Sequence, residues 1–178
     1  MGTVKNDDAL MIVKHLLKEF SGTLILDAGG LRCLAEFSQE EVNERACALV
    51  LTPHLGEMKA LYPEYKVPTD AISYAEKTKA VVLLKGNSSL ITNGKETLIT
   101  VTGCAGMAKG GSGDVLSGII AGLVASRSED ARLTHTVALG AYINGLSAEI
   151  ASDELCEISM CASDTALNVG KAISKIIK

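Results

Sequence analysis

One short stretch of the sequence, Ala105–Gly118, holds the residue types that phosphoryl transfer needs. Gly110–Gly113 predicts a tight turn, and Asp114 precedes an apolar run whose bulky residues recur at helical spacing. A turn that leads into a helix N-terminus presents several backbone N–H groups to an anion, and Asp114 would lie in the first helical turn, within reach of that anion. The N–H groups can hold a transferred phosphoryl group while the carboxylate takes the proton of the accepting hydroxyl.

The same residues also have a purely structural interpretation, in which the glycines only form a turn and Asp114 only caps a helix. Several glycines and an aspartate lie close together in the sequence, directly ahead of a long apolar helix, and this favours the anion site. Two known phosphate motifs are excluded, because no Gly-Lys-Ser/Thr follows and no acidic residue is placed as a Rossmann glycine pattern requires. Residue types and spacing alone therefore predict phosphoryl transfer to a small-molecule alcohol.

Three short apolar segments must position further polar residues. They predict strands buried on both faces of a parallel sheet: 23–26, 47–51 and 80–84. The first strand leads into Asp27, which begins a predicted loop over 27–31 that contains Gly29-Gly30. The other two strands lead into Thr52-Pro53-His54 and into Lys85. Ligands of α/β proteins bind at the carboxyl ends of such strands, so these residues are candidates for a binding site.

The remaining segments complete the prediction of an α/β fold with helices on both faces of a mostly parallel sheet. Asn93-Gly94 predicts a β-hairpin with a type I′ turn across 90–101. A helix across 8–20 is expected to be capped by Asp7 or Asp8, and a later one by Thr69. The last helix is expected to start near Ser163 and to carry Ala166, Leu167, Val169, Ile173 and Ile176 inward. Other helices are expected at 39–45, after 58 up to the break at Tyr62-Pro63, from the Thr69 cap to about 79, at 114–126 and at 133–152.

Composition excludes several classes of protein. The chain is 47% hydrophobic and 21% charged, which indicates a soluble globular protein. Aromatic residues make up only 3%, the net charge is −4, and the lysines are scattered, which argues against nucleic-acid binding. No apolar run approaches the ~18–20 residues of a membrane span. The five cysteines show no C-x-x-C pairing, so we expect no metal site, reduced thiols and a cytoplasmic protein.

The glycine-rich stretch Gly106–Gly118 resembles the signature of the ADP/ATP-dependent NAD(P)H-hydrate dehydratases, a family of the ribokinase-like superfamily. Thr52-Pro53-His54-x-Gly-Glu resembles a second family signature, whose histidine contacts the hydrated nicotinamide. The resemblance therefore implies substrate-binding roles for His54 and Asp114. The hairpin supports it, since ribokinase-like folds carry one beside the nucleotide, and 161–164 resembles the family's C-terminal Ala-Ser-Asp segment.

A third segment resembles the Lys-Gly-x-x-Thr sequence that lines the family's nucleotide site. In this chain it reads Lys85, Gly86, Asn87, Ser88 and Ser89, so that serine stands in place of threonine and the hydroxyl is retained. These residues are implied to bind the nucleotide together with Gly113. For Asn87 and Ser88 a simple polar turn is an equally good interpretation.

The resemblance implies a reaction in which ADP or ATP phosphorylates the hydroxyl of hydrated NADH or NADPH, after which phosphate is lost. Gly111, Ser112 and Gly113 would form the anion hole, and Asp114 would be the catalytic base. Mg²⁺ would screen the phosphate charge. The partners implied are these small molecules and further copies of the chain, in a homo-oligomer that family resemblance makes a tetramer.

The chain departs from the family pattern at Gly29, which stands where the family has a second aspartate. Its first residues, Met1-Gly2, resemble the tail of a Gly-x-Gly turn that lies well inside the family's domain. We therefore expect 1–178 to be a single ribokinase-like domain that lacks the family's N-terminal third. An open sheet edge at strand 23–26 would then favour self-association or loss of activity.

Two other functions remain open on the sequence. A vitamin or sugar kinase of the same superfamily shares the glycine-rich loop and the aspartate, and would release a stable phosphorylated product. An inactive nucleotide-binding fragment would bind ADP without turnover.

Overall fold

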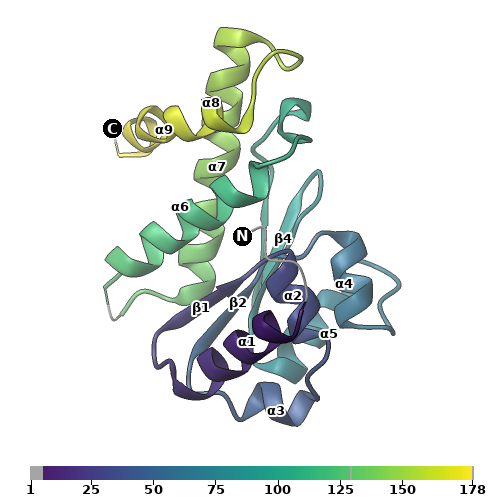
Figure 1. Cartoon of the computed structure of the whole chain (residues 1–178). Coiled ribbons are helices and arrows are strands. Elements are labelled where there is room, and N and C mark those ends of the chain that lie inside the picture. Colours follow the sequence, from purple (N-terminus) through teal and green to yellow (C-terminus); the bar gives the residue numbers. More distant parts are fainter. Residues whose placement is uncertain (1–5, 129, 178) are drawn as a thin grey trace. The chain divides into compact units, whose positions relative to one another are not determined.

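The computed structural model describes residues 6–128 and 130–177, which form two compact units (Figure 1). Unit 1 comprises the described residues up to Gly86 together with Leu90–Leu98, and unit 2 comprises Asn87–Ser89 and the described residues from Ile99 onward. Among the described helices, none is both long enough and apolar enough to cross a membrane.

The described residues form a five-stranded sheet in the order β1-β2-β3-β4-β5. Its strands are β1 (Thr23–Leu26), β2 (Ala48–Leu51), β3 (Val81–Leu84), β4 (Ser89–Thr92) and β5 (Thr97–Thr100). The first three run parallel, and β4 returns antiparallel to β3. This arrangement, flanked by helices, confirms the α/β fold expected from the apolar segments.

The strands are placed by burial of their aliphatic side chains. All four residues of β3 are buried, as are the last three of β2. Leu49, Leu51 and Val82 belong to one core cluster of unit 1, which the first helix joins through Val13 and Leu17. A continuous apolar run is what a strand covered on both faces requires, and this explains why the sequence located these strands within a residue.

Most helices of unit 1 lie close to the predicted positions, but Gly29–Leu34 is a helix where a loop was expected. The helix expected after 58 already begins at Leu55, and two helix caps also differ. The helices are α1 (Asp7–Glu19), α2 (Gly29–Leu34), α3 (Gln39–Asn43), α4 (Leu55–Leu61) and α5 (Asp70–Thr78). The cap of α1 is Asn6, whose Oδ1 accepts from the N–H of Ala9 at 2.8 Å, so the expected Asp7 or Asp8 cap was wrong. Thr69 likewise makes no capping bond to α5; Asp70 instead accepts from the N–H groups of Lys66 and Val67.

The hairpin between β4 and β5 is present, but its turn is not type I′. Four residues, 93–96, connect the strands, and of the Asn-Gly pair only Gly94 has a positive φ, +87°. A type I′ turn needs a positive φ at both central residues. Here the Asn93 side chain accepts from the N–H groups of Lys95 and Glu96, at 3.0 Å each, and this holds Asn93 outside the left-handed region.

Unit 2 is mainly helical. Its elements are the 3₁₀ turn η1 (Ala105–Met107) and the helices α6 (Ser112–Ser126), α7 (Leu133–Leu155), α8 (Ala162–Leu167) and α9 (Val169–Ile176). Helices α6 and α7 lie alongside each other in Figure 1. They approach closely at Gly140, where a Cβ would lie only 2.8 Å from Cγ1 of Ile120.

The single last helix expected from Ser163 is in fact two helices. Asn168 separates α8 from α9, and its Nδ2 donates to the carbonyl of Asp164 at 3.0 Å. A side chain that bonds the preceding turn competes with the regular helical pattern. The break also corrects the expected inward face, since Leu167 is 80% exposed.

Strand β1 lies at one end of the sheet order, and an apolar groove runs beside it. The groove has a volume of about 240 Å³ and is lined by Ala9, Ile12, Val13, Leu16, Leu24, Ile25, Leu26, Asp27, Gly29, Gly30 and Cys33. An edge strand offers unpaired N–H and C=O groups as well as apolar surface. This edge therefore retains the features from which self-association was expected.

We expect Ile12→Lys to reduce concentration-dependent self-association, because it places a charge on the wall of the groove. Met11→Lys is a matched control: Met11 is the neighbouring residue of α1 and is 65% exposed, against 59% for Ile12, but it does not line the groove. Sedimentation equilibrium measures the effect. Equal changes in the two variants, or a parent protein that is monomeric at every concentration, would contradict the expectation.

Candidate functional site

The carboxyl ends of β1, β2 and β3 bring together side chains that are far apart in the sequence. The parallel register pairs Leu26 with Leu51 and Leu51 with Val82. Beyond it, His54 and Lys85 form an isolated parallel bridge, in which the N–H of Lys85 donates to the carbonyl of Pro53 at 2.8 Å. Residues that follow each strand therefore meet at one edge of unit 1.

The ammonium group of Lys85 is the centre of this edge. Its Nζ lies 2.7 Å from Oδ1 of Asp27 and 3.8 Å from Oε2 of Glu57. The Lys85 side chain is 23% exposed, while those of Asp27 and Glu57 are only 5% and 9% exposed. Carboxylates with so little access to water need a compensating cation, and Lys85 supplies it for both.

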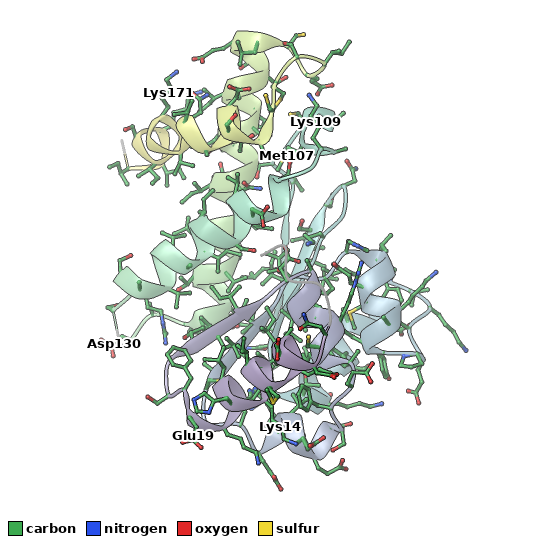
Figure 2. All side chains as sticks on the ribbon, viewed as in Figure 1. Lys14, Glu19, Met107, Lys109, Asp130 and Lys171 are labelled. Carbon is green, nitrogen blue, oxygen red and sulfur yellow. The ribbon has the colours of Figure 1, made fainter. Side chains whose placement is uncertain are left out.

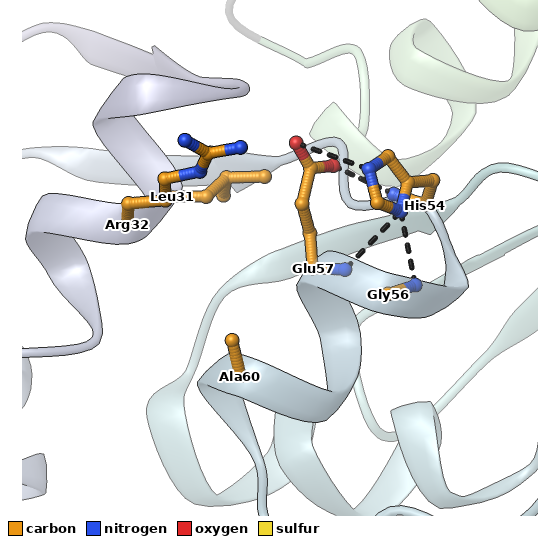
Figure 3. A pocket seen from close by; sticks show the side chains of 6 residues that line it. All are labelled: Leu31, Arg32, His54, Gly56, Glu57 and Ala60. Carbon is orange, nitrogen blue, oxygen red and sulfur yellow. Dashed lines mark hydrogen bonds and ion pairs between the residues drawn. The ribbon is translucent and has the colours of Figure 1, made fainter. Parts of the chain in front are cut away.

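His54 caps the N-terminus of α4 with its ring. Nδ1 accepts hydrogen bonds from the N–H groups of Gly56 and Glu57, at 2.9 and 3.2 Å (Figure 3). Glu57 makes the reciprocal bond: Oε2 of its carboxylate accepts from the N–H of His54 at 2.9 Å. This is a capping box in which histidine takes the place usually held by serine or threonine.

The capping box explains two residues of the Thr-Pro-His-x-Gly-Glu segment to which sequence reasoning gave no role. A Cβ on Gly56 would lie 2.9 Å from Cε1 of His54, so glycine leaves room for the ring. Glu57 returns the capping bond. A polar residue followed three positions later by glutamate at the start of a helix is the signal that could have found it.

A pocket of about 220 Å³ opens beside this ring, between α2 and α4. It is lined by Leu31, Arg32, His54, Gly56, Glu57 and Ala60. In Figure 3 the Arg32 side chain extends from α2 toward the Glu57 carboxylate, with the His54 ring beyond it. The pocket thus offers a cation, an imidazole and a carboxylate to a small polar group.

In unit 2, the glycine-rich turn leads directly into the N-terminus of α6. Gly111 is the N-cap residue, with φ +91°, and its carbonyl accepts from the N–H of Val115 at 3.1 Å. The N–H groups of Gly113 and Asp114 lie in the first turn, where a helix provides no internal acceptor. The N–H of Ser112 is directed to the carbonyl of Lys109, at 3.4 Å. The Asp114 side chain is exposed, beside the positive end of the helix dipole.

Lys109 braces this turn against the segment that follows α7. Its Nζ donates to the carbonyls of Glu157 at 2.8 Å and Ile158 at 3.1 Å, and also to that of Met160. Figure 2 marks Met107 and Lys109 at the start of the glycine-rich turn. Sequence reasoning missed this role, because the three acceptors are backbone atoms that no side-chain pattern reveals.

The segment at the start of α8 also approaches the turn. A Cβ on Gly111 would lie 3.1 Å from Cβ of Ala162, and Asp164 accepts from the N–H of Cys161 at 2.7 Å. The segment that resembles the family's C-terminal Ala-Ser-Asp sequence is therefore next to the glycine-rich turn, within unit 2.

The predicted site residues thus fall into two groups. His54 and Lys85 lie together in unit 1, and Gly111–Asp114 lies together in unit 2. Lys85–Ser89 spans the division between the units, since Gly86 belongs to unit 1 and Asn87, Ser88 and Ser89 to unit 2. The described residues contain no group of three or more His, Cys, Asp or Glu side chains that could hold a metal ion.

Comparison with known proteins identifies the family of the chain. A family model described as NAD(P)H-hydrate dehydratase matches residues 1–170. The bifunctional NAD(P)H-hydrate repair enzyme of Archaeoglobus fulgidus is 34% identical over 177 residues, which cover 99% of this chain and 33% of that protein. The ADP-dependent (S)-NAD(P)H-hydrate dehydratase of Cenarchaeum symbiosum is 32% identical over 166 residues, which cover 84% of this chain and 55% of that protein.

Solved structures agree in fold. The ADP/ATP-dependent NAD(P)H-hydrate dehydratase from Bacillus subtilis, co-crystallised with ATP/Mg²⁺, superposes with a TM-score of 0.85 at 26% identity, covering 98% of this chain and 62% of that one. A ribokinase-like superfamily protein from Enterococcus faecalis superposes with a TM-score of 0.79 at 23% identity, covering 98% of this chain and 61% of that one. The fold is therefore ribokinase-like, and the chain spans about a third of the length of the first curated relatives it matches.

Gly111→Ala is expected to lower the free energy of unfolding by about 1–2 kcal/mol, because an L-residue is strained at a left-handed φ. Its Cβ would also press on Ala162. Gly110→Ala is the control, since a Cβ there meets nothing within 4 Å, and stability should be unchanged or slightly raised. Urea denaturation measures both variants, and equal stabilities would show that the turn does not require glycine at 111.

Proposed function

The chain belongs to the NAD(P)H-hydrate dehydratase family, and on that basis we propose that it acts in the ADP- or ATP-dependent dehydration of hydrated NADH and NADPH. The nucleotide would phosphorylate the hydroxyl of the hydrate, and the loss of that phosphate would restore the dihydronicotinamide. The observation that carries the proposal is the conformation of the two family signatures: His54 stands at the carboxyl ends of the parallel strands, and Gly111–Asp114 stands at a helix N-terminus.

The glycine-rich turn supports the phosphoryl-transfer step. We assign the anion hole to Gly111, Ser112 and Gly113, and the base to Asp114; the Ser112 N–H would exchange the Lys109 carbonyl, at 3.4 Å, for the anion. The hydroxyl oxygen of the hydrate attacks the terminal phosphorus of the nucleotide while its proton passes to the Asp114 carboxylate. The bond from phosphorus to the bridging oxygen breaks, and the nucleotide leaves with one phosphate fewer. Elimination of phosphate then breaks the carbon–oxygen bond, and loss of a proton from the adjacent ring carbon to a base or to water forms the double bond of the dihydronicotinamide.

His54 supports recognition of the hydrated ring. Because Nδ1 is occupied by two backbone donors, the ring can donate only through Nε2–H. A donor of this kind suits an acceptor oxygen of the hydrated nicotinamide. We assign nucleotide binding to Lys85–Ser89 together with Gly113. The Lys85 side chain forms an ion pair with Asp27. The proposed nucleotide site is therefore assigned to the segment Lys85–Ser89 and not to the Lys85 ammonium group alone.

Among the described residues, no three His, Cys, Asp or Glu side chains cluster as ligands of a metal ion. Mg²⁺ is commonly held by substrate phosphates with only one or two carboxylates. We propose that Mg²⁺ arrives with the phosphates of the nucleotide, whose charge it would screen. On family resemblance we further propose a cytoplasmic homo-oligomer.

Turnover with hydrated NADH and either nucleotide tests the function. The proposal predicts NADH and free phosphate in equal amounts, with AMP from ADP or ADP from ATP. A stable phosphorylated product would instead identify a small-molecule kinase. Nucleotide binding without any turnover would identify an inactive nucleotide-binding chain.

Asp114→Asn should lower the turnover rate by about 10²–10⁴ while leaving ADP affinity unchanged, because a general base acts only in the chemical step. Asp153→Asn is the matched control, an aspartate on α7 that is likewise exposed and has no assigned role. Stopped assays measure the rate, and calorimetry measures the affinity. A variant that keeps more than about a tenth of the parent rate would remove Asp114 from the role of base.

His54→Asn should raise KM for hydrated NADH far more than KM for ADP. Asparagine is chosen because it is a strong N-cap residue, so α4 keeps its cap while the imidazole is lost. Initial rates with each substrate varied in turn give the two constants. An increase confined to KM for ADP would show that His54 faces the nucleotide instead.

A further inference from the structure

Glu57 lies at the candidate site, yet none of the assignments above gives it a functional role. Its Oε2 accepts from the N–H of His54 at 2.9 Å and lies 3.8 Å from Nζ of Lys85. Its Oε1 lies 3.5 Å from Nε2 of His54. Only 9% of the side chain is exposed, so these neighbours take the place of water. The two oxygens of one carboxylate thus face the backbone and the ring of His54 and the ammonium of Lys85.

The hydrogen bonds of the other ring nitrogen fix the proton on His54. A backbone N–H can only donate, and two of them point at Nδ1. Nδ1 therefore carries no proton, and a neutral ring must carry its proton on Nε2. Nε2–H is the atom that faces Glu57. The backbone N–H groups thus require an acceptor at Nδ1, and the Glu57 carboxylate requires a donor at Nε2, which is what a neutral ring protonated on Nε2 provides.

We infer that Glu57 is a positioning residue that holds the His54 imidazole as an oriented Nε2–H donor and, through Lys85, ties that ring to the ion pair with Asp27. The inference deepens the proposed function, because an oxygen of the hydrated nicotinamide would replace Oε1 of Glu57, now 3.5 Å away, as the acceptor of this same Nε2–H. The state of the ring can nevertheless be measured without any turnover.

Glu57→Gln separates the two roles of this side chain, which are to accept the bond from the His54 N–H and to orient the His54 ring. The backbone and the ring of His54 together need two acceptors, whereas a glutamine side chain offers one acceptor and one donor. If the amide oxygen keeps the bond from the His54 N–H, the amide nitrogen points a donor at Nε2–H. The ring must then reorient or move its proton, and both changes alter its nitrogen resonances.

Long-range ¹H–¹⁵N correlation spectra of histidine-labelled protein provide the measurement. At about pH 8.5, where an ordinary imidazole with a pKa of about 6.5 is neutral, the parent protein should show His54 as a single Nε2–H tautomer. Glu57→Gln should lose that pattern. His15 and His135 are internal references in the same spectra.

Glu41→Gln is the matched control, since Glu41 holds the same capping-box position on α3, opposite Ser38, with no histidine in the box. It should leave the His54 pattern intact. An unchanged His54 pattern in Glu57→Gln, or an equal change in Glu41→Gln, overturns the inference. Should Glu57→Gln not fold, the parent spectrum still decides, because an Nδ1–H or averaged pattern overturns the inference by itself. A protein without dehydratase activity would contradict the proposed function and leave these spectra interpretable.

Discussion

A single ammonium group compensates two carboxylates at the edge where β1, β2 and β3 end. Asp27 and Glu57 have little access to water, and Nζ of Lys85 lies 2.7 Å from the first and 3.8 Å from the second. The parallel register makes this possible, because it brings Lys85 beside His54 and places Asp27, the residue after β1, within reach of Lys85. Breaking such an arrangement by removing the cation would leave two nearly buried charges without compensation. The position of the His54 ring depends on this edge, since Glu57 belongs both to the ion-pair cluster and to the cap of α4.

In unit 2 a lysine also holds the glycine-rich turn, but it donates to backbone carbonyls instead of pairing with carboxylates. Lys109 donates to three backbone oxygens of the segment after α7. That segment leads into α8, whose Ala162 lies against Gly111. The turn before α6 is thus contacted by Lys109 and by Ala162, and its Gly111 has a φ of +91°, in the left-handed region that favours glycine. An anion site is most effective when its donors are held in place before the ligand arrives.

Much of the fold could be predicted from the sequence, because its strands are continuous apolar runs and the helix after Asp114 has clear helical spacing. Gly29-Gly30 predicted a loop, but both glycines lie in α2, where tertiary packing of Leu31 and Leu34 outweighs their low helix propensity. The turn at Asn93 is not the predicted type I′ turn, because the Asn93 side chain accepts from the backbone N–H groups of Lys95 and Glu96. The positions of His54 and Gly111 in the fold confirm where the motifs should lie, whereas their roles stay predictions, as does a single domain over 1–178. The role of Glu57 in the cap of α4 could have been found from the spacing of His54 and Glu57. Lys109 could not be found from a motif, since its partners are backbone carbonyls set by tertiary contacts.

We propose that the hydrated nicotinamide is recognised at His54 and the transferred phosphate at Gly111–Asp114. Backbone amide shifts of the labelled protein, titrated separately with ADP and with hydrated NADH, test this division of the ligands. We expect ADP to move the amides of Gly111 and Gly113, and hydrated NADH to move those of His54 and Gly56. Shifts caused by ADP at His54 with none at Gly111–Gly113, or no response of His54 to saturating hydrated NADH, would contradict it.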